Sequence, residues 1–420
     1  MALTYKESQK IRATIPALTE HGEVVISVFY RNLLRDHPEL KNFFNTANQV
    51  NGFQPRALAS IIIQFAKNIN HIYELVPRME RICQKHCSLG VQPEHYTILG
   101  KKLIEAFSEV LGPVMTPDVR LAWTKAYSIL ANMFIGREKQ LYGSWGRWTG
   151  WRQFRVEKRV PESPDICSFI LKPADGQRLP DFMPGQYISV RVNVPGKEYK
   201  QIRQYSLSDA PRADHYRITI KRDDGSKYRP AKSDIRCPYS PAPGVVSNQL
   251  LDSLFAGDVI EVSHPTGQFY LDTNNLSSEP VVLISAGIGA TPVVSILNFI
   301  AEQQPARPIF WIHGARTVAP FQAHITRLAQ EKPNLRTKVF KTHLADADLA
   351  GVTYDYDYRL DLATLSAEDL CLSRDCAEYY VCGPEQFMLE TADYLESQNV
   401  DPVRIKFELF ATGERAASPS

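Results

Sequence analysis

The chain has 420 residues, of which 44% are hydrophobic and 22% are charged, a composition typical of folded globular proteins. This length exceeds what one hydrophobic core supports and predicts two or three domains. The 48 basic and 46 acidic residues leave a formal net charge of +2 without a basic stripe, so we expect no nucleic-acid partner. No apolar run approaches the roughly 18 residues of a membrane span, so we expect no such span.

Cysteine usage and the N-terminal segment bear on cellular location. The seven cysteines lack the dense, regular spacing of disulfide-stapled domains, which predicts reduced thiols. The N-terminal segment carries Glu7 among its basic residues and lacks the apolar stretch of a secretory signal. We therefore expect a cytoplasmic protein, with a mitochondrial location left open.

Residues 1–146 are expected to form an all-α domain. Apolar residues recur at three- and four-residue spacing in segments 21–36, 55–75, 93–112 and 117–142. Proline, asparagine and glycine interrupt these segments, which predicts roughly six to eight helices.

The pattern changes after a joint rich in glycine and tryptophan, Tyr142–Trp151. Short β-rich runs with turn residues between them then predict an antiparallel β-barrel over residues 151–274. Within it, Asp223–Pro243 is rich in proline and has no period, so we interpret it as a surface loop. In residues 278–420 strands alternate with helices, which predicts an α/β domain with a parallel sheet.

One cluster in the helical part raises the question of a metal. Cys83, His86 and Cys87 are spaced three and four apart and share one face of a helix. A zinc site is one interpretation, but it lacks a fourth ligand and the spacing matches no usual zinc pattern. The residues alone leave two other interpretations open, a buried structural histidine and a ligand in a larger pocket.

The α/β part contains a strand, a glycine turn and a helix start in residues 281–297. Gly287 and Gly289 allow close approach of a ligand, Thr291 is expected to cap the helix, and Pro292 suits its first turn. The bare N–H groups of a helix start attract a pyrophosphate. A second strand ends at Cys382–Pro384, and two such strand ends side by side form the crevice where α/β sheets bind ligands.

Two stretches of the barrel also fit a nucleotide. Arg203 could bind a phosphate bidentately, Tyr205 could cover an aromatic ring and Ser206 could donate to a ring nitrogen. An exposed amphipathic edge strand is the alternative. Gly244 and Ser247 stand at another helix start, a second possible phosphate site.

With the motifs RQYSLS, GVVSNQL, GIGATP and VCGPEQFM in that order, residues 150–420 resemble the ferredoxin–NADP⁺ reductase family. The resemblance implies FAD on the barrel and NADPH or NADH on the α/β domain. It implies that the flavin is bound by Gln186, Tyr187, Arg203, Gln204, Tyr205, Ser206, Gly244, Val245, Val246 and Ser247, with Phe410 against its ring. It places the nicotinamide site at Gly287, Gly289, Ala290, Thr291, Pro292, Cys382, Gly383 and Pro384. Arg316 would pair with the 2′-phosphate of NADPH, although a surface arginine is an equal alternative.

The helical part, with FFNTANQVNG and KAYSILANMFIGREKQLY, resembles a globin, and the entire chain is similar to the flavohaemoglobins. The resemblance implies that His86 is the proximal iron ligand of haem b and that Cys83 and Cys87 have no metal role. Tyr96 and Glu138 would lie behind the histidine. On the distal side it implies Tyr30, Gln54 and Leu58, and it places Phe44 against the porphyrin.

The resemblance implies nitric oxide dioxygenation. NAD(P)H would reduce FAD, FAD would reduce haem, and O₂ at the haem would oxidise NO to nitrate. O₂ and NO are then the small-molecule substrates, and we expect a monomer. The alternatives are an O₂ carrier or sensor and a general NAD(P)H-dependent reductase.

Overall fold

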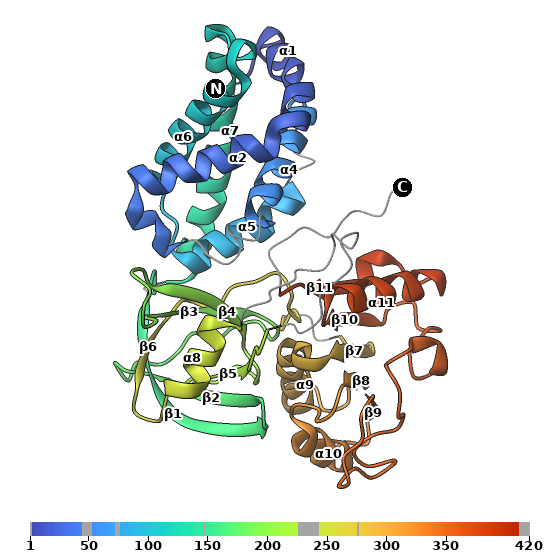
Figure 1. The fold of residues 1–420 in the computed structure, drawn as a ribbon. Coiled ribbons are helices and arrows are strands. Elements are labelled where there is room, and N and C mark those ends of the chain that lie inside the picture. Colours follow the sequence, from blue (N-terminus) through green and yellow to red (C-terminus); the bar gives the residue numbers. More distant parts are fainter. Residues whose placement is uncertain are drawn as a thin grey trace.

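The computed structural model describes residues 2–43, 53–71, 76–146, 148–225, 243–274 and 277–410, except for the side chains of residues 53–55, 57 and 76–78. Three bodies are arranged as a helical part above a barrel and a second sheet (Figure 1). This is the predicted fold class: an all-α part, an antiparallel β part and a parallel α/β part. Most of the loop 223–243 lies outside the described residues, so its interpretation is untested. The limits 1–146, 151–274 and 278–420 stay predictions.

The helical part consists of α1 (Tyr5–Ala13), α2 (Ile15–Asp36), η1 (Pro38–Asn42), α4 (Phe53–Lys67), α5 (Val76–Leu89), α6 (Pro93–Leu111), η3 (Gly112–Val114) and α7 (Pro117–Ser144). Local signals fix several ends: Thr4 and Glu7 form a capping box, and the Thr116 hydroxyl accepts from Val119 N. Helix α2 packs on α4 and α6, while α7 packs on α1, α5 and α6. Their apolar faces bury one core that includes Phe29, Phe65, Phe107 and Trp123.

The β part contains β1 (Arg152–Ser163), β2 (Ile166–Pro173), β3 (Tyr187–Val192), β4 (Gln201–Ser206), β5 (Tyr216–Lys221), β6 (Val259–Val262) and α8 (Val245–Ser253). The strands pair in the order β4-β3-β6-β1-β2-β5, and all pairs are antiparallel. A bridge between Leu207 and Ile218 brings the end of β4 to β5, so the first and last strands meet as in a barrel.

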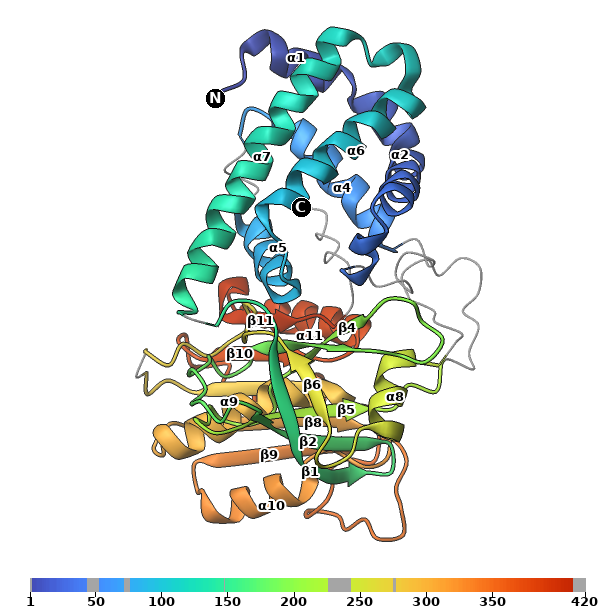
Figure 2. The ribbon, with the colours of Figure 1, turned by 90° about the vertical axis from the view of Figure 1, so that its left-hand side faces the viewer.

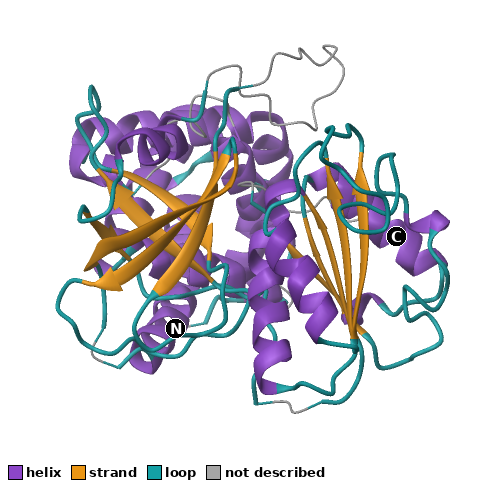
Figure 3. Ribbon diagram, turned by 90° about the horizontal axis from the view of Figure 1, so that it is seen from below, coloured by secondary structure: helices purple, strands orange, loops and turns teal. Residues whose placement is uncertain are grey.

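The third part contains β7 (Val281–Ala286), η4 (Gly287–Gly289), α9 (Ala290–Gln303), β8 (Ile309–Ala315), α10 (Gln322–Glu331), β9 (Leu335–Lys341), η5 (Leu362–Thr364), β10 (Glu378–Cys382), α11 (Glu385–Ser397), η6 (Pro402–Arg404) and β11 (Ile405–Glu408). The parallel strands follow the order β11-β10-β7-β8-β9. Seen from below, the barrel and the parallel sheet lie on opposite sides of a layer of helices (Figure 3). Helices α9 and α10 share one apolar core with the sheet and α11 shares the other, so both faces are covered.

No helix in the described ranges combines the length and apolar character needed to cross a bilayer. Helix α5 lies at the lower end of the helical part in two perpendicular views and faces the barrel and the parallel sheet (Figures 1 and 2).

Candidate functional site

His86 is held by two residues from neighbouring helices. Its Nδ1 lies 2.8 Å from the hydroxyl of Tyr96 on α6 and 2.9 Å from Oε1 of Glu138 on α7. The Tyr96 hydroxyl also donates to the same Glu138 oxygen. Burial, reinforced by the Glu138 charge, raises the pKa of Tyr96, so the phenol stays protonated and remains a donor. The structure thus brings together three residues that the sequence places up to 52 positions apart.

The opposite nitrogen of His86 is open. Among the described residues, Nε2 has no hydrogen-bond partner, and the side chain is 30% exposed although Cys83 and Cys87 beside it are buried. An imidazole that is tied at Nδ1 and open at Nε2 has the arrangement of a metal-ligating histidine. It fits a haem iron held in the helical part.

The cysteines do not support the zinc interpretation. Burial raises the pKa of the Cys83 thiol to about 12, and it also raises the pKa of Cys87, so neither is a thiolate at neutral pH. Over the described part of the chain, no cluster of three or more His, Cys, Asp or Glu could hold a metal ion. Glu138, which could have been a solvated surface charge, is 3% exposed.

The distal residues are placed only in part. Tyr30 lies on α2, half-buried, with its ring 5.0 Å from that of Phe29. Leu58 lies half-buried on α4 against the helical core. Phe44 lies outside the described residues, and so does the side chain of Gln54 near the start of α4. Their expected roles stay predictions.

One guanidinium of the barrel has no carboxylate partner within the described ranges. Arg203 on β4 is half-buried and donates from Nη1 to the Ile202 carbonyl at 2.7 Å, and no carboxylate of the described residues pairs with it. Burial lowers its pKa, because desolvation of the charge outweighs the opposing effect of Tyr205. Helix α8, which packs on β4 and β5, begins after Gly244 with no side-chain cap. A desolvated arginine and a bare helix start fit the diphosphate of FAD.

The other expected flavin residues lie at the starts of β3 and α8 and at the end of β4, and some of their side chains already have partners. The Gln186 amide accepts from Met183 N at 2.9 Å and reaches the Gly267 carbonyl at 3.5 Å, so it braces the turn before β3. Burial raises the pKa of Tyr187 to about 12, and it also raises that of Tyr205. Ser206 ends β4 opposite Tyr187, while Val245 and Val246 open α8 beside Ser247.

The two strand ends of the parallel sheet meet as expected. Strands β7 and β10 are neighbours, with Ser285 paired to Cys382. A Cβ added to Gly289 would lie 2.2 Å from the Cys382 carbonyl oxygen, so only glycine lets the η4 turn approach β10 and the Gly383–Pro384 segment this closely.

One local expectation at this turn is wrong. Thr291 does not cap α9, because the helix already begins at Ala290 and Gly289 holds the N-cap position without a side-chain bond. The Thr291 hydroxyl instead donates to the Ile288 carbonyl at 3.0 Å. Pro292 does lie in the first turn of the helix, as expected.

Arg316 and Phe410 occupy exposed positions. Arg316 follows β8 with its side chain in solvent, at the strand end where an adenosine ribose would be read. Phe410 is the last described residue and is 50% exposed.

Sequence reasoning missed a group of charged residues where the helical part meets the parallel sheet: Glu408, Arg81 and Lys85. Glu408 ends β11, and burial raises its pKa to about 7 against the opposing pull of Arg81 and Lys85 on α5. Burial likewise lowers the pKa of Lys85 to about 8. The only indication of this arrangement in the sequence was the position of Lys85 directly before His86.

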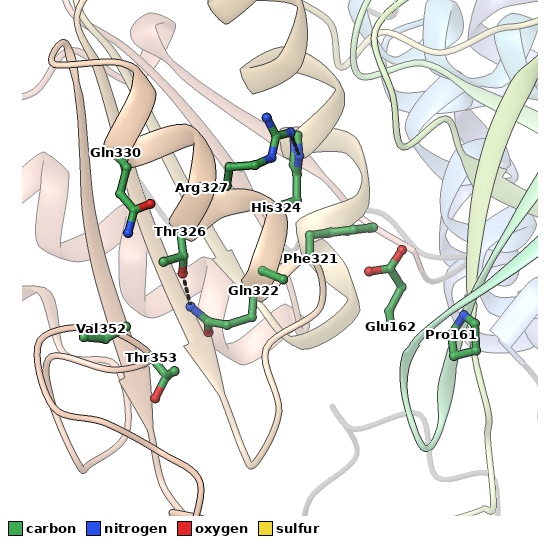
Figure 4. Close-up of a pocket in the computed structure, with 11 residues that line it drawn as sticks. Pro161, Glu162, Phe321, Gln322, His324, Thr326, Arg327, Gln330, Val352 and Thr353 are labelled. Atoms are coloured by element: carbon green, nitrogen blue, oxygen red, sulfur yellow. Dashed lines mark hydrogen bonds between the residues drawn. The ribbon is translucent and has the colours of Figure 1, made fainter.

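Two open hollows lie apart from the expected cofactor residues. One, of about 560 Å³, lies between Pro161–Glu162 of β1 and helix α10, where His324 and Arg327 point toward one another (Figure 4). The other, of about 470 Å³, lies between η1 and the segment that joins β3 to β4. Of the residues predicted for haem, FAD or NAD(P)H whose side chains the structure describes, none lines either hollow.

Comparison with known proteins agrees with the three-part architecture. The Globin family matches residues 27–134, the oxidoreductase FAD-binding domain family matches residues 153–270, and the oxidoreductase NAD-binding domain family matches residues 283–393. The chain is 42% identical over 410 residues to a flavohemoprotein of Bordetella parapertussis, covering 96% of this chain and 97% of the relative. It is 39% identical over 414 residues to a flavohemoprotein of Bacillus subtilis, with 97% of each covered.

Solved structures give the same picture. A flavohemoglobin from Malassezia yamatoensis with bound FAD and heme superposes with a TM-score of 0.80 at 28% identity, covering 98% of this chain and all of that one (100%). The FAD/NAD-binding domain of a nitric oxide dioxygenase from Vibrio cholerae superposes with a TM-score of 0.51 at 31% identity, covering 61% of this chain and 97% of that one.

Proposed function

Because the chain belongs to the flavohaemoprotein family and is thus an oxidoreductase with haem, FAD and NAD(P)H as cofactors, we propose that it is a nitric oxide dioxygenase. When bound, FAD divides the electron pair of NAD(P)H into single electrons, and haem supplies the iron at which O₂ and NO combine to nitrate.

The hydrogen-bonded group of His86, Glu138 and Tyr96 carries the proposal. His86 would hold the iron through Nε2, while the Glu138 carboxylate accepts at Nδ1. A carboxylate behind the imidazole makes it more anionic and a stronger electron donor to the iron. An O₂ store has no need of this donation or of a fused reductase, which favours dioxygenation over storage.

The other side chains would bind and orient O₂ and the cofactors. Tyr30, with Gln54, would donate to O₂ on the distal side, where Leu58 would also lie, and Phe44 would pack against the porphyrin. Arg203 and the start of α8 would hold the FAD diphosphate, and Tyr205 and Ser206 its ring. The Gly289 turn and Cys382–Pro384 would hold the nicotinamide, and Arg316 would favour NADPH over NADH.

His86→Ala tests the assignment that everything else depends on. We expect the variant to lose stable haem binding and nitrate formation but to keep FAD, because the flavin residues lie in another part of the chain. The haem-to-flavin ratio from the absorption spectrum measures this. A normal ratio would show that another residue binds the iron. In the parent protein, cytochrome reduction that outpaces nitrate formation would favour a general reductase.

A further inference from the structure

Helix α5 is used on two opposite faces. Met79, Cys83 and Cys87 are buried in the helical core, and His86 turns toward Glu138. Arg81, Gln84, Lys85 and Ser88 recur at three- and four-residue spacing on the opposite side of the helix. A helix that carries an iron ligand on one face therefore presents a polar face away from the helical core.

That polar face contacts both other parts of the protein. Arg81 Nη2 donates to the Leu409 carbonyl, after β11, at 3.3 Å. Gln84 Oε1 accepts from the Gly267 amide at 3.2 Å. The hydroxyl of Ser189, on β3, donates a hydrogen bond to the Ser88 hydroxyl at 3.1 Å, and both residues are fully buried. In views from two directions, α5 lies next to the barrel and the parallel sheet (Figures 1 and 2).

The serine contact belongs to a chain of hydrogen bonds with a fixed direction. The Ser88 hydroxyl donates its single hydrogen to the Lys85 carbonyl at 2.8 Å, so it accepts from Ser189. Ser189 in turn accepts from Gln204 Nε2 at 3.2 Å. Gln204 lies on β4, the strand predicted to bind the flavin, and the Lys85 carbonyl belongs to the peptide bond that joins Lys85 to His86. The chain therefore links the flavin strand to the backbone of the proposed iron ligand.

Two further contacts hold the same arrangement. The Ser189 amide donates to Ser263 Oγ at 2.8 Å, which fixes this point of β3 against the segment after β6. Trp145, at the end of α7, stacks on His264 of that segment, with ring centres 4.5 Å apart and planes 5° apart. The segment that supports Ser189 thus also receives the end of the helical part.

We propose that Ser88 and Ser189 are positioning residues for the transfer of one electron from reduced FAD to ferric haem. This inference rests on the proposed function, with NAD(P)H as the reductant, and no bond forms or breaks along the hydrogen-bond chain. The rate of electron transfer falls steeply as the distance between flavin and haem increases. The contact that holds α5 against β3 therefore sets this rate. Neither serine contacts the reacting groups, so each acts through the placement of α5.

Single and double substitutions test the pair. We expect Ser88→Ala and Ser189→Ala each to slow haem reduction roughly two- to tenfold, which corresponds to about 0.4–1.4 kcal/mol, the range of one neutral hydrogen bond. Flavin reduction by NAD(P)H, followed in the same anaerobic mixing experiment, should keep its rate. The double variant should lose no more than the more affected single variant, because both remove the same contact.

Ser168→Ala is the matched control. Ser168 is also a fully buried barrel serine, but its hydroxyl bonds to Thr219 and Glu162, within the barrel. Haem reduction at the parent rate in both single variants would overturn the proposal. So would an additive loss in the double variant, or an equal loss in the control.

A disulfide between the two positions tests their contact without relying on catalytic turnover. With Ser88→Cys and Ser189→Cys together, we expect a mild oxidant to form a disulfide in both the cofactor-free and the loaded protein, mapped by peptide mass. Ser88→Cys with Ser168→Cys should not crosslink. The locked, loaded protein should still reduce its haem. Absence of the crosslink in folded protein, or a lock that stops haem reduction while flavin reduction continues, would overturn the proposal. Nitrate formation is measured separately, so failure of the dioxygenase assignment is distinguishable.

Discussion

Glu138 is a buried carboxylate with two donors directed at one oxygen, Tyr96 Oη and His86 Nδ1. Removing the charge while keeping the shape isolates its effect. We expect Glu138→Gln to retain haem, to raise the reduction potential of the haem because the imidazole becomes less anionic, and to lower nitrate formation roughly 10- to 100-fold. Spectroelectrochemistry and nitrate assays measure the two effects.

Glu80→Gln provides the comparison on the same pair of helices. Glu80 of α5 pairs with Arg137 of α7, one residue before Glu138, but does not contact His86. Its variant should keep the parent potential. Equal shifts in both variants would mean that Glu138 only anchors α7 to α5.

A second buried group links one residue to pH stability. His313 of β8 is fully buried, shares a 2.8 Å hydrogen bond with Ser285, and has no partner at Nε2 among the described residues. Burial lowers its pKa from 6.5 to about 3, so the unfolded chain takes up a proton as pH falls below about 6.5 while the folded chain does not. Because of this residue, the free energy of unfolding falls by about 1.4 kcal/mol for each pH unit as the pH decreases from about 6.5 to about 3.

Replacing His313 by Gln removes that proton uptake. Thermal unfolding of the full chain at pH 7.5 and pH 5 should show a smaller loss of stability on acidification in His313→Gln than in the parent. Parallel losses in the two proteins would show that His313 is protonated equally in the folded and unfolded states.

At the scale of elements, the η4 turn shows how a glycine couples two strands. Gly289 has φ −59°, which alanine also adopts, so any effect of a substitution there is steric. Gly289→Ala would press a methyl group against the Cys382 carbonyl, and we expect a stability loss of about 1–3 kcal/mol together with a raised KM for NAD(P)H.

Gly143→Ala serves as the comparison for that substitution. Gly143 lies in α7, and apart from its chain neighbours and the nearby backbone of that helix, no atom of the described residues lies within 4 Å of an added Cβ. The variant should therefore be neutral or slightly stabilised. An unchanged KM and unfolding midpoint in Gly289→Ala would show that the turn relaxes without cost.

Periodicity and turn residues predicted most elements, because each reports a local preference. The helical spacing of residues 117–142 became α7, and the strand before Gly287 became β7. The start of α9 was misassigned at Thr291, since a threonine in a glycine turn resembles a cap although the helix begins one residue earlier. Roles at Phe44 and Gln54 depend on parts of the chain that the structure does not describe.

For the whole molecule, the sequence indicated the three parts and their order but not how they meet. Gln84 and Ser88 on α5 are spaced like an ordinary solvated helix face, and nothing local marks them as contact residues. Their partners lie on β3 and in the segment after β6, more than a hundred residues away in the sequence, as the Ser88–Ser189 hydrogen bond shows. Glu408 was missed for the same reason, because the two cations that act on its pKa, Arg81 and Lys85, lie on α5.

Isotope labelling of the oxygen atoms tests whether this protein converts NO and O₂ to nitrate. NO, O₂ and one electron balance to one nitrate, so each two-electron donor should yield about two nitrates. Protein loaded with haem and FAD, supplied with NAD(P)H, NO and ¹⁸O₂, should produce nitrate that carries two labelled oxygen atoms at about that ratio. NAD(P)H oxidation without nitrate, or nitrate without both labelled oxygens, would contradict the assignment of this chain as a nitric oxide dioxygenase.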